Sequence, residues 1–395
     1  MKLIYIANAR IPTEMAHGLQ IMKMCEAFSK FKVKSPANSA GRRQLKVELV
    51  VPWRFRISEL GKKDPFEYYK VDRIFKIKKI FCFDLTPLNR FLGPISFLVQ
   101  AFSFSFFALI YLIFKKANII YGRDRFCLFF ISFIKKNIVF EVHKIHRFFF
   151  WPIFRRIKKT VVITENLRSI LIKRGIDGNK IFVVPDGVDL KDFEVKESRE
   201  ECRKKLNLPV DKNLILYTGH LYKWKGVETL ALASKFLSKK ELMVIVGGIK
   251  WYLSNFRNFI KKNTLKNILI LGYQDYSKIP YFLKASDCLV LTGTKKSNVS
   301  QYQTSPMKMF EYMASGRPTI ASDLPSFREA LNQNNSILIE PDNPQALVEG
   351  IKKVLNNPEL AEKISRQAYK DVQNYTWEKR AKIIIDFITN RKSKS

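Results

Sequence analysis

Short apolar runs recur along the chain, separated by stretches long enough for a helix, and they fall into two sets. The first set of predicted strands is Lys2–Ala7, Gln44–Val51, Phe75–Phe83, Ala117–Tyr121, Asn137–Val142, Thr160–Ile163 and Ile181–Val184. The second set is Leu214–Tyr217, Leu242–Val246, Ile268–Leu271, Cys288–Leu291, Pro318–Ala321 and Ser336–Ile339. Strands that alternate with helices are typical of parallel sheets in α/β proteins. The sequence therefore predicts an α/β chain with two Rossmann-like domains.

The domain boundary is predicted near residue 190. A length of 395 residues exceeds one ordinary core and suits two domains of roughly 150 to 200 residues each. A turn with the sequence VPDGVD, which ends at Asp189, precedes a charged stretch, Lys191–Lys205, that we interpret as a linker. We place the first domain at residues 1–190 and the second at residues 191–376. A last helix, Trp377–Asn390, and a short tail complete the chain at residues 377–395.

The charge balance predicts an anionic partner. The chain has 70 Lys and Arg and 35 Asp and Glu, which gives a formal net charge of +35. Repulsion among these positive charges disfavours a compact state unless an anionic partner binds. The basic residues show no helix-turn-helix or zinc-finger spacing, so we expect no nucleic acid. The 32 Phe are concentrated in the first half. Basic and aromatic residues together favour an anionic membrane surface.

The cysteines and the N-terminus indicate the compartment. Five cysteines are scattered without a CxxC pair or a matching histidine spacing, so neither a disulfide framework nor a metal site is indicated. This favours a reducing cytosol. The first apolar run is too short for the core of a signal peptide. We therefore expect a cytoplasmic protein, peripheral on the inner face of the cell membrane.

One stretch is long enough to span a bilayer. Ile95–Phe114 holds twenty residues without a charge, between Arg90 and Lys115. The strand Ala117–Tyr121 follows at once, and a spanning helix would separate that strand from the first three. The alternative is a helix packed on the sheet with one face near the interface. The aromatic and basic stretch His146–Lys159 is open to a similar pair of interpretations, core with a solvated rim or lipid-facing surface.

A phosphate-binding pattern lies near the start of a predicted helix that ends at Gly316. Ser305, Pro306, Lys308 and Glu311 stand at its opening. Free N–H groups and a lysine there suit a diphosphate, and a carboxylate one turn further on suits sugar hydroxyls. The alternative is purely structural, with Ser305 as the cap, Pro306 at the first helical position, and Lys308 and Glu311 as a solvated ion pair.

The same segment resembles the donor-site signature of glycosyltransferase family 4, in the variant S-P-x-K-x-x-E-Y-M-A-x-G-x-P. The matching residues are Ser305, Pro306, Lys308, Glu311, Tyr312, Met313, Ala314, Gly316 and Pro318. The stretch GHLYKWKG, Gly219–Gly226, resembles the first donor-phosphate element of that family. The resemblance implies a GT-B fold, in which two Rossmann-like domains face each other across a cleft and the last helix crosses back. It also implies transfer of a sugar from a nucleotide diphosphate with retention of configuration, without a metal or another cofactor.

The resemblance assigns roles to residues of the second domain. Lys225, Lys308 and the amides around Ser305 and Pro306 would hold the diphosphate, and Glu311 would hold the ribose. Two positions depart from the family pattern. Gln303 stands where a glutamate is expected, so hydrogen bonding would replace a carboxylate there. His220 stands where arginine is usual, so we expect donor affinity to fall as pH rises through about 6.5.

The resemblance also assigns residues of the first domain. His143, at the end of the predicted strand Asn137–Val142, stands where the family places a histidine near the reacting sugar, with Glu141 and His146 as weaker candidates. Gly18 ends a polar loop that would approach the bound acceptor or phosphate. An amphipathic helix is predicted from Leu19 to Phe31 after that loop, and the polar residues 35–43 are interpreted as another loop.

Two other functions fit the sequence. A sugar-nucleotide epimerase has the same two-domain architecture and binds the same donor, but it needs no acceptor. A non-catalytic protein that binds membranes or nucleic acid would also be basic, and its binding would depend steeply on salt. The transferase interpretation predicts a glycan or lipid-linked acceptor in the synthesis of cell-envelope polysaccharide or lipopolysaccharide. The sequence does not identify the sugar, the base or the linkage.

Overall fold

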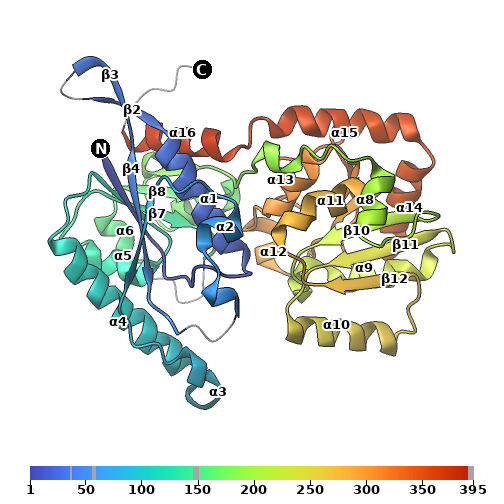
Figure 1. Cartoon of the computed structure of the whole chain (residues 1–395), viewed down its shortest axis with the longest axis horizontal. Coiled ribbons are helices and arrows are strands. Elements are labelled where there is room, and N and C mark those ends of the chain that lie inside the picture. The colour runs from blue at the N-terminus through green and yellow to red at the C-terminus, as the bar shows by residue number, and fades with distance from the viewer. Residues whose placement is uncertain (36–37, 56–58, 146–150, 390–395) are drawn as a thin grey trace. The chain divides into compact units, whose positions relative to one another are not determined.

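The computed structural model describes residues 1–35, 38–55, 59–145 and 151–389, which form two compact α/β units (Figure 1). Unit 1 comprises Met1–Pro185 and Trp377–Ser395, and unit 2 comprises Asp186–Thr376. Each unit is built on a parallel sheet, so the prediction of two Rossmann-like domains is confirmed. The chain leaves unit 1 once and returns to it with its last helix.

The described part of unit 1 contains a sheet of seven parallel strands in the order β5-β4-β1-β6-β7-β8-β9. The strands are β1 (Lys2–Ile6), β4 (Lys46–Pro52), β5 (Lys76–Ile80), β6 (Ile119–Gly122), β7 (Ile138–Val142), β8 (Lys159–Val162) and β9 (Ile181–Val183). Each overlaps one strand predicted from the first set of apolar runs. The order reverses beside β1, so the carboxyl ends of β1 and β6 lie at the switch point where such sheets bind ligands.

Helices cover both faces of this sheet. They are α1 (Ala16–Lys30), α2 (Pro65–Tyr69), α3 (Asn89–Leu92), α4 (Pro94–Ile113), α5 (Arg125–Ile131), α6 (Ile153–Arg156), α7 (Glu165–Lys173) and α16 (Trp377–Ile388). The prediction of a helix near Leu19–Phe31 is confirmed, although α1 begins three residues earlier and includes Gly18. The helix α16 packs against α1, which ties the C-terminal end of the chain to unit 1.

The interpretation of residues 35–43 as a loop was wrong. Strands β2 (Lys32–Ser35) and β3 (Asn38–Gln44) form an antiparallel pair, in which Val33 is opposite Arg43. This stretch is polar and lacks the alternation of a half-buried strand, so its pairing left no periodic signal in the sequence.

The long apolar helix α4 lies along the sheet of unit 1. By length and composition it could cross a membrane, and 39% of its most apolar 18 residues are buried. Phe104, Ala108 and Leu112 are fully buried in the same core as Ile4 and Ile120, which belong to β1 and β6. A crossing of the bilayer by α4 would have to carry these strands with it. In the structure, α4 is therefore packed on the sheet of unit 1.

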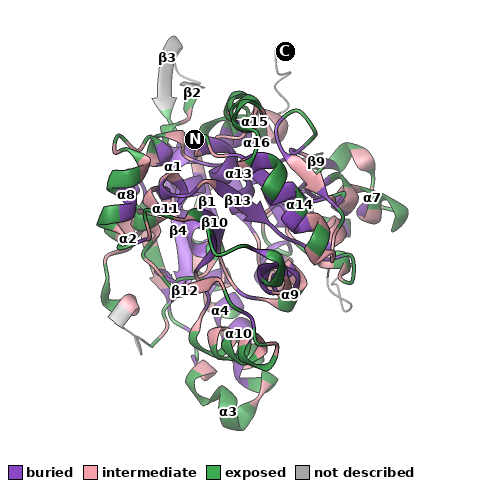
Figure 2. Cartoon of the chain, turned by 90° about the vertical axis from the view of Figure 1, so that its right-hand side faces the viewer, coloured by how far each residue is buried: buried purple, intermediate pink, exposed green. Residues whose placement is uncertain are grey.

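Unit 2 contains a sheet of six parallel strands in the order β12-β11-β10-β13-β14-β15. The strands are β10 (Asn213–Thr218), β11 (Glu241–Val246), β12 (Ile268–Gly272), β13 (Cys288–Leu291), β14 (Thr319–Ser322) and β15 (Ile337–Ile339). All six overlap the predicted second set. Figure 2 shows buried strands such as β10 and β13 in purple. The order again reverses beside β10, which makes the carboxyl ends of β10 and β13 the switch point.

The helices of unit 2 are α8 (Arg199–Lys205), α9 (Val227–Ala233), α10 (Lys250–Lys262), α11 (Ile279–Ala285), α12 (Asn298–Tyr302), α13 (Met307–Ala314), α14 (Pro344–Leu355) and α15 (Pro358–Val372). The linker interpretation of residues 191–205 was wrong, because α8 forms there. Ser198 and Glu201 make a reciprocal capping box, and Cys202 is fully buried. The charged composition concealed an amphipathic helix whose capping signal is present in the sequence.

Candidate active site

Two lysine side chains converge on the backbone just after β10. Gly219 follows that strand with φ of +118°, and a Cβ placed there would lie 4.0 Å from the Nζ of Lys225 and 4.0 Å from the Nζ of Lys308. Lys225 ends the 3-10 helix η5 (Lys223–Lys225), and Lys308 lies in the first turn of α13. Parts of the chain that are far apart in sequence thus bring two amino groups to the carboxyl end of the sheet.

Lys308 is held by uncharged partners. Its side chain is buried, its Nζ donates to the carbonyl oxygen of Thr218 over 3.2 Å, and it lies 3.6 Å from the centre of the Tyr217 ring. Burial, and next the charge of Lys225, lower the pKa of Lys308 well below its ordinary value. No carboxylate within 4.0 Å neutralises this lysine in unit 2, all of which the structure describes. A bound anion would supply the counter-charge that no carboxylate of unit 2 provides within this distance.

Lys225 is positioned by the glycine that follows it. Gly226 has φ of +69°, and a Cβ there would lie 2.6 Å from the carbonyl oxygen of Gly293, so no larger residue fits. The hydroxyl of Thr292 donates to the carbonyl oxygen of Lys225 over 2.8 Å. Burial lowers the pKa of Lys225 to about 8, against the opposing effect of the Glu311 carboxylate.

Glu311 lies one turn beyond Lys308 on α13 and is buried. The hydroxyl of Tyr276 donates to its Oε1 over 3.0 Å. Burial raises the pKa of Glu311 to about 7, although the hydrogen bond from Tyr276 and the charge of Lys308 act in the opposite direction. The alternative that Lys308 and Glu311 form a solvated ion pair is therefore wrong, because both are buried and each contacts another group.

The start of α13 lies one residue later than the sequence-based expectation. The helix begins at Met307, and Pro306 precedes it with extended backbone angles. The Oγ of Ser305 accepts from the backbone N–H of Asp186 over 3.2 Å, so the alternative that Ser305 is the cap of the helix is wrong. The N-terminus of the helix still lies one residue before Lys308, where its dipole favours an anion.

The two residues that depart from the family pattern have separate places in unit 2. Gln303 directly follows α12, and its backbone N–H donates to the carbonyl of Val299 over 3.1 Å. His220 directly follows Gly219, with its ring 5.2 Å from that of Tyr222, and its carbonyl accepts from the hydroxyl of Tyr217 over 3.0 Å. His220 is thus adjacent in sequence to the point where the lysines converge.

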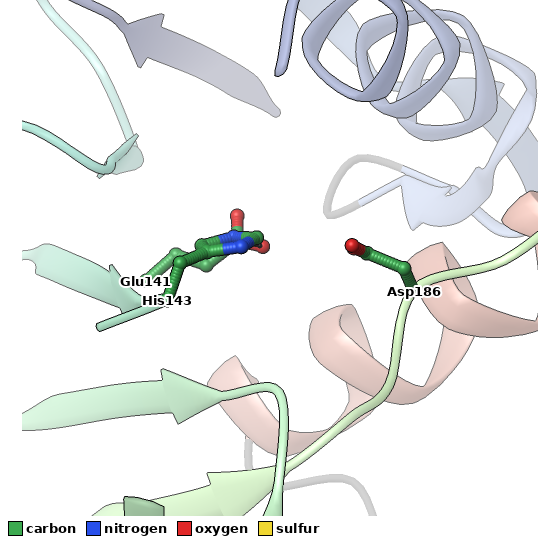
Figure 3. Close-up of side chains that lie close together, drawn as sticks. All are labelled: Glu141, His143 and Asp186. Atoms are coloured by element: carbon green, nitrogen blue, oxygen red, sulfur yellow. Dashed lines mark hydrogen bonds and ion pairs between the residues drawn. The ribbon is translucent and has the colours of Figure 1, made fainter. Parts of the chain in front are cut away.

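In unit 1, His143 and Glu141 lie next to each other at the end of β7 (Figure 3). The Nε2 of His143 is 2.8 Å from the Oε1 of Glu141. Asp186, also drawn in Figure 3, belongs to unit 2. A carboxylate on one ring nitrogen fixes the orientation of an imidazole, so Glu141 positions His143. His146, the other weak candidate, lies outside the described residues.

Glu141 is a fully buried carboxylate with several donors. It accepts from Arg380 over 2.6 Å, from Tyr121 over 2.7 Å and from Gln20 over 2.9 Å. Burial alone would raise the pKa of Glu141, but the charges of Arg380 and His143 outweigh it and hold the pKa well below its ordinary value. Sequence reasoning missed Arg380, which is distant along the chain and lies in no motif.

Gly18 lies inside α1 rather than in a loop, contrary to the sequence-based expectation. A Cβ there would lie 2.2 Å from the hydroxyl oxygen of Tyr69, which bonds to the backbone N–H and carbonyl of Thr13 over 2.7 and 2.8 Å. Close packing by Tyr69 therefore gives a structural reason for glycine at this position. A ligand role for Gly18 stays a prediction.

Comparison with known proteins bears on the unit that holds the lysines. Residues 198–371 match the family model described as "Glycosyl transferases group 1". This chain carries a group 1 glycosyltransferase domain. The domain accounts for most of unit 2, and the motif residues Lys225, Lys308 and Glu311 all lie within it.

The glycosyltransferase domain has curated relatives. Over 194 residues the chain is 28% identical to TuaC of Bacillus subtilis, a glycosyltransferase assigned to teichuronic acid biosynthesis, covering 48% of this chain and 46% of the relative. It is 27% identical over 194 residues to the UDP-Gal:alpha-D-GlcNAc-diphosphoundecaprenol alpha-1,3-galactosyltransferase of Escherichia coli, covering 47% and 48%. The matched regions span about half the length of these relatives.

The whole chain resembles solved glycosyltransferase structures. The crystal structure of Anabaena HepE in complex with UDP and glucose aligns with this chain at a TM-score of 0.73 and 15% sequence identity. The alignment covers 99% of this chain and 100% of the HepE chain. At this identity the likeness shows the fold alone. It confirms the GT-B prediction of two Rossmann-like domains with a last helix that returns to the first.

Proposed function

We propose that this glycosyltransferase moves a sugar from a nucleotide diphosphate donor to a glycan or lipid-linked acceptor, with retention of the anomeric configuration. The observation that carries the proposal is the convergence of Lys225 and Lys308 on Gly219, at the switch point of the unit 2 sheet. Two buried amino groups with lowered pKa values favour an anionic ligand of more than one charge. A diphosphate provides that charge.

The lysines would act on the leaving group. When the bond between the anomeric carbon and the β-phosphate oxygen breaks, the bonding electrons stay on the phosphate. The acceptor hydroxyl oxygen bonds to the same face of the anomeric carbon, and its proton passes to the departing phosphate oxygen. Lys225 and Lys308 would stabilise the charge that develops on the diphosphate, which lowers the barrier to transfer. We propose that this positive charge makes a divalent metal unnecessary.

The other residues would orient the donor and the acceptor. Glu311, held by Tyr276, would accept hydrogen bonds from the ribose hydroxyls. Ser305, Pro306, Gln303 and His220 would contribute to donor binding. In unit 1, His143 would contact the donor sugar or the acceptor, and Gly18 would lie near the acceptor. These roles rest on the family resemblance together with the local geometry of each residue.

The acceptor is proposed to belong to the cell envelope, in polysaccharide or lipopolysaccharide synthesis. The names of the two relatives support this, because one refers to teichuronic acid and the other to a diphosphoundecaprenol. The protein would then act in the cytoplasm, at the inner face of the cell membrane. The base, the sugar and the linkage are open.

A titration of UDP, ADP and GDP by calorimetry tests the donor site. Lys225→Ala and Lys308→Ala should each lower the affinity for the preferred nucleotide roughly ten- to a hundredfold. Each substitution removes a charge-assisted contact of about 1.5–3 kcal/mol. The preferred nucleotide sugars are then assayed for transfer with and without EDTA.

Lys223→Ala is the matched control, because Lys223 lies in the same 3-10 helix with an 89% exposed side chain. It should bind the nucleotide as the wild type does. Equal nucleotide affinity in the Lys225, Lys308 and Lys223 variants would contradict the donor-site assignment.

A further inference from the structure

The helix α4 has its polarity reversed relative to an ordinary surface helix. Its buried face carries Ser96, Gln100 and Ser105, all with no exposed surface, beside the apolar residues of the core. Its outer face carries large exposed apolar side chains: Ile95, Leu98, Phe102, Phe106, Ile110 and Ile113. In a surface helix the charged and polar residues occupy the outer face. The outer face of α4 therefore lacks the composition that water favours.

The apolar surface continues beyond α4 through contacts between phenylalanine rings. On one side Phe106 contacts Phe107 with ring centres 5.4 Å apart, and Phe107 contacts Phe81 at 5.1 Å. On the other side Phe102 contacts Phe126 at 5.6 Å. We call this area, together with α3, the phenylalanine surface. The exposed helix α3 precedes α4 and is drawn in green in Figure 2, and its Phe91 is 83% exposed.

Basic side chains border the phenylalanine surface. The Nζ of Lys115 is 5.1 Å from the Tyr111 ring, and the guanidinium of Arg125 is 4.9 Å from the Phe126 ring. From residue 76 to residue 136 the sequence has ten Lys and Arg, two Asp and no Glu. Asp84 is buried, and Asp124 accepts from the backbone of Cys127. The border of the surface is therefore positive, without an exposed carboxylate in this stretch.

We propose that the phenylalanine surface docks on an anionic lipid bilayer, with α4 lying in the plane of the interface. A helix in this position buries its apolar face among the lipid chains while basic side chains at its margin reach the headgroups. The positive border matches the negative charge of anionic headgroups. This inference concerns attachment of unit 1 and does not depend on the donor site.

The pattern favours a bilayer over a protein partner. The apolar residues lie along one face of α4 and on the adjoining α3, and Lys and Arg supply the exposed charges from residue 76 to residue 136. A protein interface commonly surrounds its apolar core with a polar, solvent-accessible rim. A second copy of this chain would bring one positive border against another, which opposes self-association.

Co-sedimentation of the full chain with vesicles tests the proposal. The protein should bind phosphatidylcholine vesicles that contain phosphatidylglycerol at least about tenfold more tightly than vesicles of phosphatidylcholine alone, and added salt should weaken the binding. A triple variant, Phe91→Glu with Ile95→Glu and Phe106→Glu, should lose at least about tenfold of that binding, because three apolar side chains no longer enter the lipid.

Trp251→Glu is the matched control, because Trp251 is 64% exposed on α10 of unit 2. It should bind vesicles as the wild type does. Nucleotide binding and circular dichroism report whether the triple variant is folded. Equal vesicle binding by the triple variant and the wild type, or binding that ignores phosphatidylglycerol, would overturn the proposal. So would self-association of the wild type in sedimentation velocity that the triple variant abolishes while vesicle binding stays the same.

Discussion

Lys225 and Lys308 stand where burial disfavours the positive charge that each would carry in water. Burial lowers the pKa of Lys225 to about 8, and burial together with the charge of Lys225 lowers the pKa of Lys308 well below its ordinary value. One sequence motif contains Lys225 and a second contains Lys308 and Glu311, which makes all three candidates for the site. Neither motif identifies Tyr276 or Tyr217, because their contacts depend on how the chain folds and no local pattern marks them.

The lowered pKa of Lys225 predicts how nucleotide affinity depends on pH. A bound diphosphate favours the charged lysine, so binding takes up a proton when Lys225 is neutral. Lys225 is charged below about pH 8, and affinity should therefore fall as pH rises through about 8, by at most tenfold per pH unit for one proton. Calorimetry of UDP binding from pH 7 to 9.5, in two buffers with different ionisation enthalpies, measures both the affinity and the proton uptake.

The control is Lys225→Arg, since arginine keeps its charge throughout this range. The variant should show a smaller fall between pH 8 and 9.5. A slope identical to that of the wild type would assign the pH dependence to another group, such as Lys308. The fall expected for His220 lies at lower pH and can be followed separately.

At the scale of elements, the sequence was most informative where the spacing of apolar residues decides the structure. It was least informative where the pairing of polar strands does. The strands of both sheets were predicted from their apolar runs. The hairpin β2–β3 was missed because polar strands carry no such pattern. The helix α8 was not predicted although Ser198 and Glu201 form a capping box, because the charged residues around them are also typical of a linker. The helix α1 also begins three residues before the predicted start, so that it includes Gly18.

The contact between Gly18 and Tyr69 gives a prediction for α1. Gly18→Ala should lower the free energy of unfolding by about 1–3 kcal/mol, because the added methyl group overlaps the hydroxyl of Tyr69. Urea unfolding followed by circular dichroism measures the change. In the double variant with Tyr69→Phe the loss should be smaller than the sum of the two single losses, because the oxygen that the methyl group meets is gone.

The double-mutant comparison also separates the two roles considered for Gly18. If the losses of stability from Gly18→Ala and Tyr69→Phe were additive, the hydroxyl of Tyr69 would not be the reason that position 18 requires glycine. A Gly18→Ala variant with unchanged stability and weakened acceptor use would instead support the predicted ligand role.

At the scale of the whole molecule, the sequence predicted the division into two units and the returning helix, and the structure moves the boundary. Unit 2 begins at Asp186, five residues or so before the expected position. The segment that follows belongs to unit 2 because the backbone of Val188 pairs with Thr376 and donates to the carbonyl of Tyr375 over 2.9 Å. The two ends of unit 2 are thus paired with each other, which no local sequence signal reveals.

The ion pair between Arg380 and Glu141 predicts that α16 stabilises unit 1. Arg380→Ala would leave the fully buried Glu141 carboxylate without its main counter-charge, which should lower the free energy of unfolding of unit 1 by about 3–5 kcal/mol at neutral pH. Because the folded-state pKa of Glu141 is held low, the stabilisation is present above the ordinary pKa of a glutamate and is lost as pH falls through the folded-state value. The deficit of the variant should therefore shrink in acid.

Hydrogen exchange resolved by peptide measures this effect in each unit separately. Arg380→Ala should speed exchange in β1, β6 and β7, and leave β10 and β13 as protected as in the wild type. Lys382→Ala is the matched control, because Lys382 is exposed on the same helix and forms an ion pair with Asp386 on the helix surface. Faster exchange in both units of the Arg380 variant would mean that they unfold as one, and unchanged exchange in unit 1 would show that Arg380 does not hold α16 to the sheet.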